Sequence, residues 1–476
     1  MSKLSAIDAA FLRMESTRTP MHVGALMTFK LPDDAPADFC QRLVAKMREQ
    51  PFMPEPFNCC LAQTRTGKPK PQWVESKVDM EYHLRHSALP HPGGEKELGV
   101  LVARMHSHPL DLTRPLWEAH VIEGLENNRF ALYFKAHHCA IDGMGAMKMV
   151  QKWLSTDPAS QDTPGPWVLA EKPPKSEPNA RSLRTRLGKV ARAAGEQLVG
   201  LRELAKGLNE MMRGEDSSAR LALEVPRSLF NQRISQQRRL GTQILDLSRL
   251  RAVCKASNTS VNDVLLAVIG GGVRRYLLEQ NAMPERSIIA SVPIGLSRGD
   301  AQTGTAAAGF ITPIGTDIDD PVARLHWIHR ITTRAKRELN ELHPTAQSQF
   351  ALMGIAPILV GQVLGILPKL PPLFNFVVSN VVLSKDPLYL MGAELEAMYP
   401  VSFLFDGYGL NVTVVGYRDR VAVGFLGCRE AIPSLQRLAV YTGEALGEME
   451  QAMAAAQARA PKKTTSRKKT KTEESC

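Results

Sequence analysis

The chain has 476 residues, too many for one hydrophobic core, and this length predicts two domains of roughly 150–250 residues each. With 44% hydrophobic and 22% charged residues, its composition is that of an ordinary globular protein. The net charge of +11 would suit nucleic acid, an anionic cofactor or an anionic membrane surface, but no nucleic-acid-binding module is recognisable, so nucleic acid is not an expected partner.

The seven cysteines are scattered and odd in number, which predicts neither a disulfide framework nor a zinc site. The histidine spacings do not indicate a metal site either, and no metal is expected. The N-terminal segment carries charges and lacks the apolar stretch of a secretory signal. These features together predict a protein of the reducing cytoplasm.

Residues 1–155 alternate between strand and helix patterns and predict a first, mixed α/β domain. Residues 51–75 are rich in proline and are expected to form a loop. The other segments are expected as strands at 21–29, 117–122 and 129–136 and as helices at 39–48 and 95–108.

Residues 156–224 separate the two halves of the chain. Proline, serine and charged residues make 156–180 a linker by composition. Residues 181–213 place leucines at steps of three and four among arginines and lysines, which predicts a basic amphipathic helix. This helix would bridge the two domains or lie on a membrane or lipid inclusion, and the two alternatives are compatible.

Residues 225–460 predict a second α/β domain, and 461–476 a basic disordered tail. A helix opens at 259–263, with Ser260 or Asn262 as its N-cap, and continues to residue 279. Residues 351–368 carry no charge, but their prolines and glycines favour two short apolar helices over a membrane span. The remaining elements are expected as strands at 243–247, 288–294, 310–314, 374–378, 410–416 and 421–425 and as helices at 250–254, 321–337 and 435–456.

The residues most suited to chemistry form a turn between a strand and a helix of the first domain. They read His137-His138-Cys139-Ala140-Ile141-Asp142-Gly143. Because neighbouring side chains on an extended backbone point to opposite sides, the two histidines cannot both face one pocket. We therefore expect one imidazole that works as a general base at neutral pH and one that holds it.

The pattern His-His-x-x-x-Asp-Gly resembles the signature of the CoA-dependent acyltransferase superfamily, which includes chloramphenicol acetyltransferases, nonribosomal peptide condensation domains and wax ester synthase/diacylglycerol acyltransferases. The last of these is the most similar, because further blocks of its sequence recur in family order between about residue 4 and residue 445. These blocks are residues 4–8, 20–24, 109–111, 114–118, 262–267, 379–381, 387–390, 400–402 and 404–407.

This resemblance implies an α/β fold of two chloramphenicol acetyltransferase-like lobes, each a mixed sheet flanked by helices, with a channel between them. It implies transfer of a long-chain fatty acyl group from acyl-CoA to a fatty alcohol or diacylglycerol, with His138 as the general base, His137 orienting it and no cofactor besides the substrate acyl-CoA. Asp142 would form a structural ion pair with an arginine of the second lobe, for which Arg298 is the candidate. A peripheral association with the inner face of a membrane or with lipid inclusions is also expected.

Three further residues near the two helix starts are given supporting roles. Gly143 would allow a tight turn or the close approach of substrate. Asn262 and Asp263 would cap a helix and brace the channel. Cys139 lies next to the base, yet as its neighbour on the turn it should point away from the pocket, which favours a packed thiol over a nucleophile.

The oxyanion of the tetrahedral intermediate needs hydrogen-bond donors. Ser379 and Asn380, at the end of a predicted strand, are similar to the family's Ser-Asn block and would either supply such donors or play a structural role. This block departs from the common family form, because Val382-Leu383-Ser384 stand where the family usually has Pro-Gly-Pro.

Two alternatives to a wax ester synthase remain at this stage. One is a condensation enzyme or acyltransferase that takes its acyl group from a carrier protein. The other is a non-catalytic coat protein of lipid inclusions that uses the amphipathic helix, the apolar stretch and the basic tail. The complete histidine motif argues against the second of these.

Overall fold

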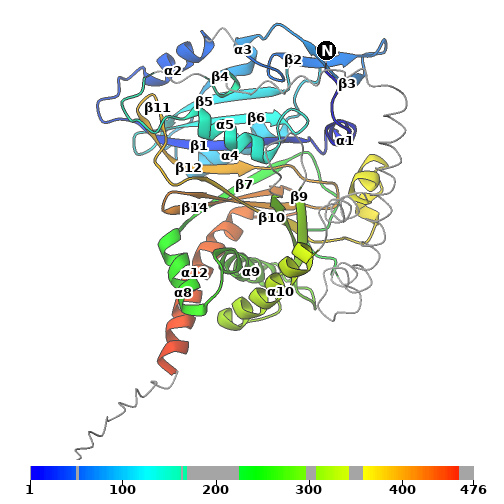
Figure 1. Ribbon diagram of the computed structural model, residues 1–476, viewed down its shortest axis with the longest axis vertical. Helices are drawn as coiled ribbons and strands as arrows, with labels where there is room; N and C mark the ends of the chain where they lie inside the picture. The colour runs from blue at the N-terminus through cyan, green and yellow to red at the C-terminus, as the bar shows by residue number, and fades with distance from the viewer. Residues whose placement is uncertain are drawn as a thin grey trace, which may run out of the picture.

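In the computed structural model, the chain forms two six-stranded mixed sheets that lie one above the other, with helices packed on them (Figure 1). The structure describes residues 2–49, 53–161, 165–168, 225–295, 307–341 and 357–459. The predicted amphipathic helix at 181–213 and the basic tail at 461–476 lie outside these residues.

The first sheet has the strand order β11-β12-β1-β6-β5-β4. At its centre, β1 pairs antiparallel with β6 along its whole length, so that His22 lies opposite His137. Both faces of β6 are buried, which agrees with its aromatic and apolar sequence. The strands are β1 (His22–Lys30), β4 (Leu84–Ala88), β5 (Trp117–Leu125), β6 (Arg129–His137), β11 (Tyr389–Leu390) and β12 (Ala393–Val401).

Two strands of the first sheet come from the second half of the chain. β12 pairs antiparallel with β1, from Gly24 opposite Val401 to Lys30 opposite Glu394, and β11 pairs with β12. The predicted second domain, residues 225–460, therefore completes the sheet of the first. The sequence boundaries do not separate the two sheets.

The second sheet has the order β7-β14-β13-β10-β8-β9, with β10 parallel to both of its neighbours. Its strands are β7 (Arg238–Asp246), β8 (Ile289–Gly295), β9 (Ala307–Pro313), β10 (Phe376–Ser384), β13 (Leu410–Tyr417) and β14 (Arg420–Cys428). The helices below it in Figure 1 are α8 (Leu247–Ser257), α9 (Val261–Glu279), α10 (Pro321–Glu341) and α12 (Leu435–Arg459).

Helix α9 is the buried centre of the second lobe. A Cβ atom on Gly270 would lie 2.0 Å from the carbonyl oxygen of Ile314, and one on Gly272 would lie 2.5 Å from Thr442 Oγ1. Glycine at these two positions lets α9 approach its neighbours, including α12, more closely than any other residue would.

The first lobe carries its helices on both sides of the sheet. They are α1 (Ala6–Met14), α2 (Phe39–Arg48), α3 (Met80–His83), α4 (Glu95–Ser107) and α5 (Gly143–Trp153). Helix α4 packs against β7 of the second sheet, and Leu98 and Val102 belong to the same continuous core as Leu240. The two lobes are thus joined by a shared hydrophobic core.

Some segments differ from their predicted structure. Residues 51–75 are not only a loop, because β2 (Cys59–Gln63) and β3 (Pro69–Glu75) form a two-stranded sheet. A single bridge from Lys3 to Gln72 is the further pairing of β3, and prolines are tolerated at such a sheet edge. The linker prediction fails at η1 (Pro166–Val168), where Trp167 is fully buried and stacks on Trp117 with ring centroids 4.7 Å apart.

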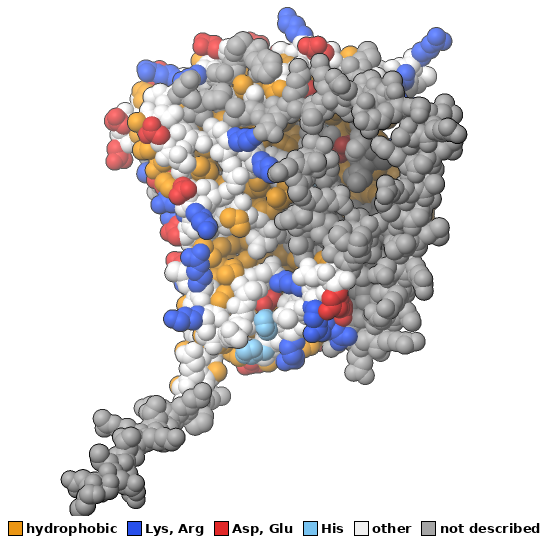
Figure 2. Space-filling view, in the orientation of Figure 1, with side chains coloured by type: hydrophobic (Ala, Val, Ile, Leu, Met, Phe, Trp, Pro, Cys, Tyr) orange, Lys and Arg blue, Asp and Glu red, His pale blue; other side chains and the backbone are white. Residues whose placement is uncertain are grey.

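The apolar stretch at 351–368 is described from residue 357 onward. Residues 357–363 are helical, and a 3-10 turn, η2 (Leu367–Lys369), follows. Within the described ranges, no helix combines the length and apolar character that a membrane crossing requires. Lysines and arginines on the described part of the face in Figure 2 are interspersed with acidic and apolar side chains and do not gather into one stripe.

Candidate active site

The histidine motif occupies the turn between β6 and α5. His137 is the last residue of β6, and its carbonyl oxygen accepts hydrogen bonds from the Ala140 and Ile141 amides at 2.8 and 3.3 Å. The Asp142 carboxylate accepts a hydrogen bond from the Gly145 amide at 2.6 Å and so caps α5. The strand-turn-helix arrangement predicted for the motif is confirmed.

His137 is held on all sides and is 1% exposed. Its Nδ1 accepts a hydrogen bond from the Cys139 amide at 3.1 Å, and its Nε2 lies 3.4 Å from Glu15 Oε2. Nδ1 is therefore hydrogen-bonded, whereas Nε2 contacts the Glu15 carboxylate without completing a hydrogen bond to the described residues. This environment suits the holding role that the sequence predicts for His137.

His138 lies at the contact between the two halves of the chain. Its ring stacks on Phe11 of α1, with centroids 3.9 Å apart, and meets Phe403, which follows β12, edge-on at 5.4 Å. The side chain is 9% exposed, and its Nδ1 is buried without a hydrogen-bond partner among the described residues. Other buried histidine nitrogens also lack a partner among the described residues, including His22 Nδ1 and His83 Nε2, so what distinguishes His138 is that its ring lies at the contact between the two halves of the chain.

Burial lowers the pKa of His138 to about 4, although the nearby Asp142 carboxylate acts in the opposite direction and raises it. The imidazole is therefore neutral at physiological pH, the form in which it can accept a proton. Cys139 differs from it: burial raises the pKa of the thiol far above its ordinary value, and the side chain packs among Leu12, Leu61 and Leu116. This packing agrees with the interpretation of Cys139 as a structural thiol.

The sequence predicts supporting roles at this turn for Arg298 and Gly143, and the structure describes only the second of these residues. Arg298 lies outside the described residues, so its ion pair with Asp142 stays a prediction. A Cβ atom on Gly143 would meet open space, and its φ is not in the left-handed region, so the tight turn does not require glycine there. Close approach of substrate is the alternative that remains for Gly143.

Asp263 is a brace of the second lobe. Ser260 is the N-cap of α9, and the Asp263 side chain completes a capping box by accepting from the Ser260 amide at 3.0 Å. The same carboxylate accepts hydrogen bonds from Thr332 Oγ1 at 2.6 Å and from His329 Nδ1 at 2.8 Å, both on α10. The capping role is confirmed for Asp263, whereas Asn262 is a half-buried neighbour within the helix.

Ser379 and Asn380 lie within β10 and not at the end of a strand, which corrects the prediction. Because Val382-Leu383-Ser384 replace the proline-containing form, the backbone continues to pair with β13 as far as Ser384. The Ser379 hydroxyl donates a hydrogen bond to Thr413 Oγ1 at 3.2 Å, and Asn380 is exposed. A role for either residue at the oxyanion stays a prediction.

β10 nevertheless leads towards the histidine turn. It pairs with β8 only at Phe376 and Val377 and then leaves it, and the Gln151 side chain of α5 donates a hydrogen bond to the Leu383 carbonyl. The strand that carries Ser379 and Asn380 therefore spans from the second sheet to the helix that follows the motif.

Sequence reasoning missed Glu15, Phe11 and Phe403, which contact the two histidines. The available signals were the family resemblance of residues 4–8 and 20–24, which flank Phe11 and Glu15, and of residues 400–402 and 404–407, which flank Phe403. The channel predicted past His138 stays a prediction, because His138 lines neither of the two cavities described here. The larger of these, about 380 Å³, lies elsewhere and is lined by Arg227, Asn231, Gln232, Arg233, Gly365, Pro368 and Lys369.

Comparisons with known proteins agree with this architecture. Residues 4–265 match the model of the wax ester synthase/diacylglycerol acyltransferase catalytic domain, and residues 303–450 match the model of the C-terminal domain of the same family. A putative diacylglycerol O-acyltransferase of Mycobacterium tuberculosis is 49% identical over 95% of this chain and 99% of its own. The O-acyltransferase WSD of Acinetobacter baylyi is 35% identical over 93% of this chain and 96% of its own.

Solved structures extend the comparison. The wax ester synthase/diacylglycerol acyltransferase of Marinobacter aquaeolei VT8 is 36% identical and superimposes with a TM-score of 0.77 over 95% of this chain and 100% of its own. The first condensation domain of the calcium-dependent antibiotic synthetase, 17% identical with a TM-score of 0.59 over 95% of this chain and 96% of its own, shares the fold. The two-lobe prediction is confirmed, and the chain belongs to the wax ester synthase/diacylglycerol acyltransferase family of O-acyltransferases.

Proposed function

We propose that this protein transfers a long-chain fatty acyl group from acyl-CoA to a long-chain alcohol, giving a wax ester, and to diacylglycerol, giving a triacylglycerol. The observation that carries the proposal is His138. It is a neutral imidazole with an unpaired nitrogen, held between aromatic rings where the two halves of the chain meet.

The reaction needs a base because an aliphatic alcohol does not ionise at neutral pH. His138 takes the hydroxyl proton as the alcohol oxygen forms a bond to the thioester carbonyl carbon. The tetrahedral intermediate then loses the CoA thiolate, and the His138 imidazolium returns the proton to the sulfur. A base positioned in this way contributes about 10²–10⁴-fold to the rate.

The surroundings of His138 suit an acyl chain. Phe11 belongs to an apolar cluster that draws side chains from both lobes and buries them next to the base. Such a surface would bind methylene groups and keep water away from the thioester. The buried members of the cluster are Phe11, Met14, Met21, Ile289, Ile358, Leu367, Phe374, Phe405 and Tyr408.

Peripheral binding to the inner membrane face or to lipid inclusions, from the cytoplasmic side, is part of the same proposal, because its substrates are lipids. The support is a group of exposed apolar side chains beside Lys369: Val360, Val363, Leu364 and Ile366 are 57, 52, 63 and 39% exposed. Flotation with anionic vesicles tests this binding. Leu364→Asp should reduce the bound fraction, and unchanged binding would refute the role of this surface.

The test of the catalytic proposal is release of free CoA from palmitoyl-CoA, followed with a thiol reagent, in the presence of hexadecanol or a diacylglycerol. His138→Ala should lose about 10²–10⁴-fold in kcat. His326→Ala, at an exposed position of α10, is the matched control and should retain wild-type rates. Full turnover by the His138→Ala variant would refute His138 as the base. Activity only with an acyl-carrier protein as donor would favour the carrier-dependent alternative.

A further inference from the structure

We propose that Glu15 is a positioning residue of the acyl-transfer site, and that one of its carboxylate oxygens supports both of the hydrogen bonds that fix the backbone of His138. This inference rests on the proposed function of His138 as the base. Glu15 lies far before the histidine motif in the sequence.

The first support passes through Met21. Glu15 follows the last residue of α1, and its Oε2 accepts a hydrogen bond from the Met21 amide at 2.5 Å. The carbonyl oxygen of the same residue, Met21, accepts the His138 amide at 2.8 Å. Met21 is fully buried, so neither partner can be replaced by water without rearrangement.

The second support passes through His137. Because its Nδ1 accepts the Cys139 amide, that nitrogen carries no proton, and in the neutral ring the proton must be on Nε2. Nε2 lies 3.4 Å from the same Glu15 Oε2, a close contact that does not complete a hydrogen bond, and the neighbouring carboxylate favours the ring form that carries its proton on this nitrogen. The Glu15 side chain is 8% exposed, which strengthens its hold on this tautomer. His138 is thus fixed on one side by its own amide and on the other by that of Cys139.

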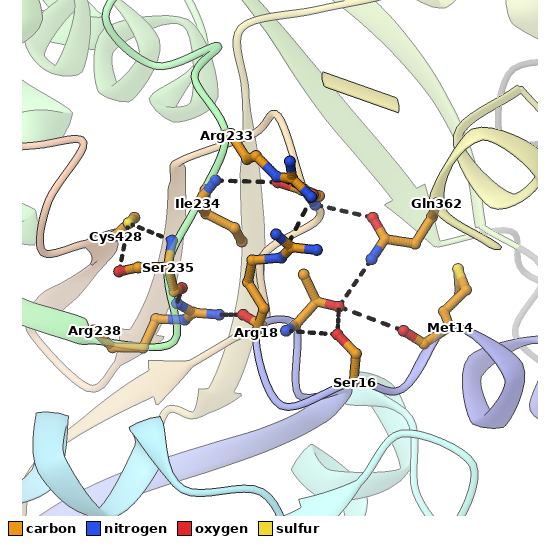
Figure 3. Close-up of polar contacts among 11 residues, drawn as sticks. Met14, Ser16, Arg18, Arg233, Ile234, Ser235, Arg238, Gln362 and Cys428 are labelled. Atoms are coloured by element: carbon orange, nitrogen blue, oxygen red, sulfur yellow. Dashed lines mark hydrogen bonds and ion pairs between the residues drawn. The ribbon is translucent and has the colours of Figure 1, made fainter. Parts of the chain in front are cut away.

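The loop that carries Glu15 is fixed in turn by the second half of the chain. Thr19 is 1% exposed, and its hydroxyl accepts a hydrogen bond from Gln362 Nε2 at 2.9 Å, while Gln362 Oε1 accepts the Asp406 amide at 2.9 Å. Arg18 lies 3.7 Å from the Asp406 carboxylate, and its carbonyl accepts from Arg238 at 2.7 Å. Figure 3 shows Gln362 and Arg238 reaching this loop from the second half of the chain, with Arg238 bonded at Arg18.

Loss of the Glu15 carboxylate would leave the Met21 N–H group without an acceptor in a buried place and would remove the carboxylate that lies 3.4 Å from His137 Nε2. The turn would then shift or the imidazole of His137 would change tautomer, and His138 would move with it. A displacement of about 1 Å in a reacting group can cost about 10²-fold in rate. Because Glu15 holds the base and not the substrate, the loss should fall on kcat and spare KM.

The experiment compares wild type with Glu15→Ala, Glu15→Gln and the control Glu49→Gln, an exposed carboxylate after α2. Glu15→Ala should lose about 10²-fold in kcat with KM for palmitoyl-CoA changed by less than about threefold. Glu15→Gln keeps one acceptor oxygen and should fall between the alanine variant and wild type. Glu49→Gln should match wild type in both constants.

A second measurement does not depend on activity. Nitrogen-15 spectra of histidine-labelled protein report which nitrogen of His137 carries the proton: Nε2 alone in wild type, and a mixture of tautomers in Glu15→Gln. An inactive wild type would refute the proposed function and leave this spectrum as the test of Glu15. If wild type is active, unchanged kcat in Glu15→Ala refutes the proposal. If that variant does not fold, an unaltered His137 spectrum together with wild-type kcat in Glu15→Gln refutes it.

Discussion

Two turns of this molecule each lead into a helix and each contain a carboxylate close to a histidine, buried at Asp263 and half-buried at Asp142, yet their hydrogen bonds are completed differently. Before α9, the Asp263 carboxylate accepts from Ser260, Thr332 and His329. Before α5, the Asp142 carboxylate accepts the Gly145 amide, but His137 Nε2 and His138 Nδ1 have no hydrogen-bond partner among the described residues. The hydrogen bonds of the first turn are complete, whereas the second turn leaves His138 Nδ1 able to accept a proton from substrate.

The largest test of this distinction is at Asn380. Its exposed side chain makes no hydrogen bond to the described residues, whereas Ser379 already donates to Thr413. If polar side chains without a hydrogen-bond partner belong to the reacting site, Asn380→Ala should lose about 10²–10³-fold in kcat, as removal of an oxyanion donor does. Ser379→Ala is the matched control and should lose much less in kcat. Equal small effects of both variants on steady-state turnover would refute an oxyanion role for Asn380.

The strand-turn-helix around the histidine motif could be predicted from sequence because its signals are local. Apolar and aromatic residues precede His137, and residues at helical spacing follow Gly143. The assignment of a holding role to one histidine also needed only the alternation of side chains along a strand. These conclusions do not depend on where the remainder of the chain lies.

The contacts that complete the site are not local, and that is why sequence did not reveal them. Glu15 reaches His137 only because β1 pairs with β6, and Phe403 reaches His138 only because β12 crosses to the first sheet. Neither pairing has a sequence signature, since many apolar strands could pair in these orders. The end of β10 was misplaced for a related reason: nothing in residues 379–384 stops the strand.

A second prediction concerns the turn before α9, whose hydrogen bonds a substitution of Asp263 would remove. Asp263→Ala would leave Thr332, His329 and the Ser260 amide without their acceptor next to the buried start of α9. Loss of buried hydrogen bonds to a charged group should lower the free energy of unfolding by about 3 kcal/mol, measured by denaturant titration. Asn262→Ala, at the adjacent half-buried position, is the control and should cost less. Equal stability of the two variants would contradict the bracing role.

The smallest expected effect concerns acid. The pKa of His138 is lowered to about 4, by burial first and by the neighbouring His137 as well, against the opposing charge of Asp142. Its folded value is below its unfolded value of about 6.5, so between these pH values the unfolded chain binds more protons. Stability is therefore complete above pH 6.5 and falls as pH decreases towards 4. Burial also lowers the pKa of His106 to about 3, which adds to the same trend.

The stability that Asp263 contributes to the turn before α9 should not change between pH 5 and pH 7.5. Burial opposes ionisation of Asp263, but its hydrogen bonds prevail and hold the pKa of that carboxyl below its ordinary value of 3.8, so its contribution is lost as pH falls from that value to the lowered one. Between pH 5 and pH 7.5, kcat/KM of the folded enzyme should stay level because neutral His138 persists, while the free energy of unfolding decreases towards pH 5. An acid limb of kcat/KM centred near pH 6.5 would instead mean that the base titrates as an exposed histidine, and that the base is a histidine other than the buried His138.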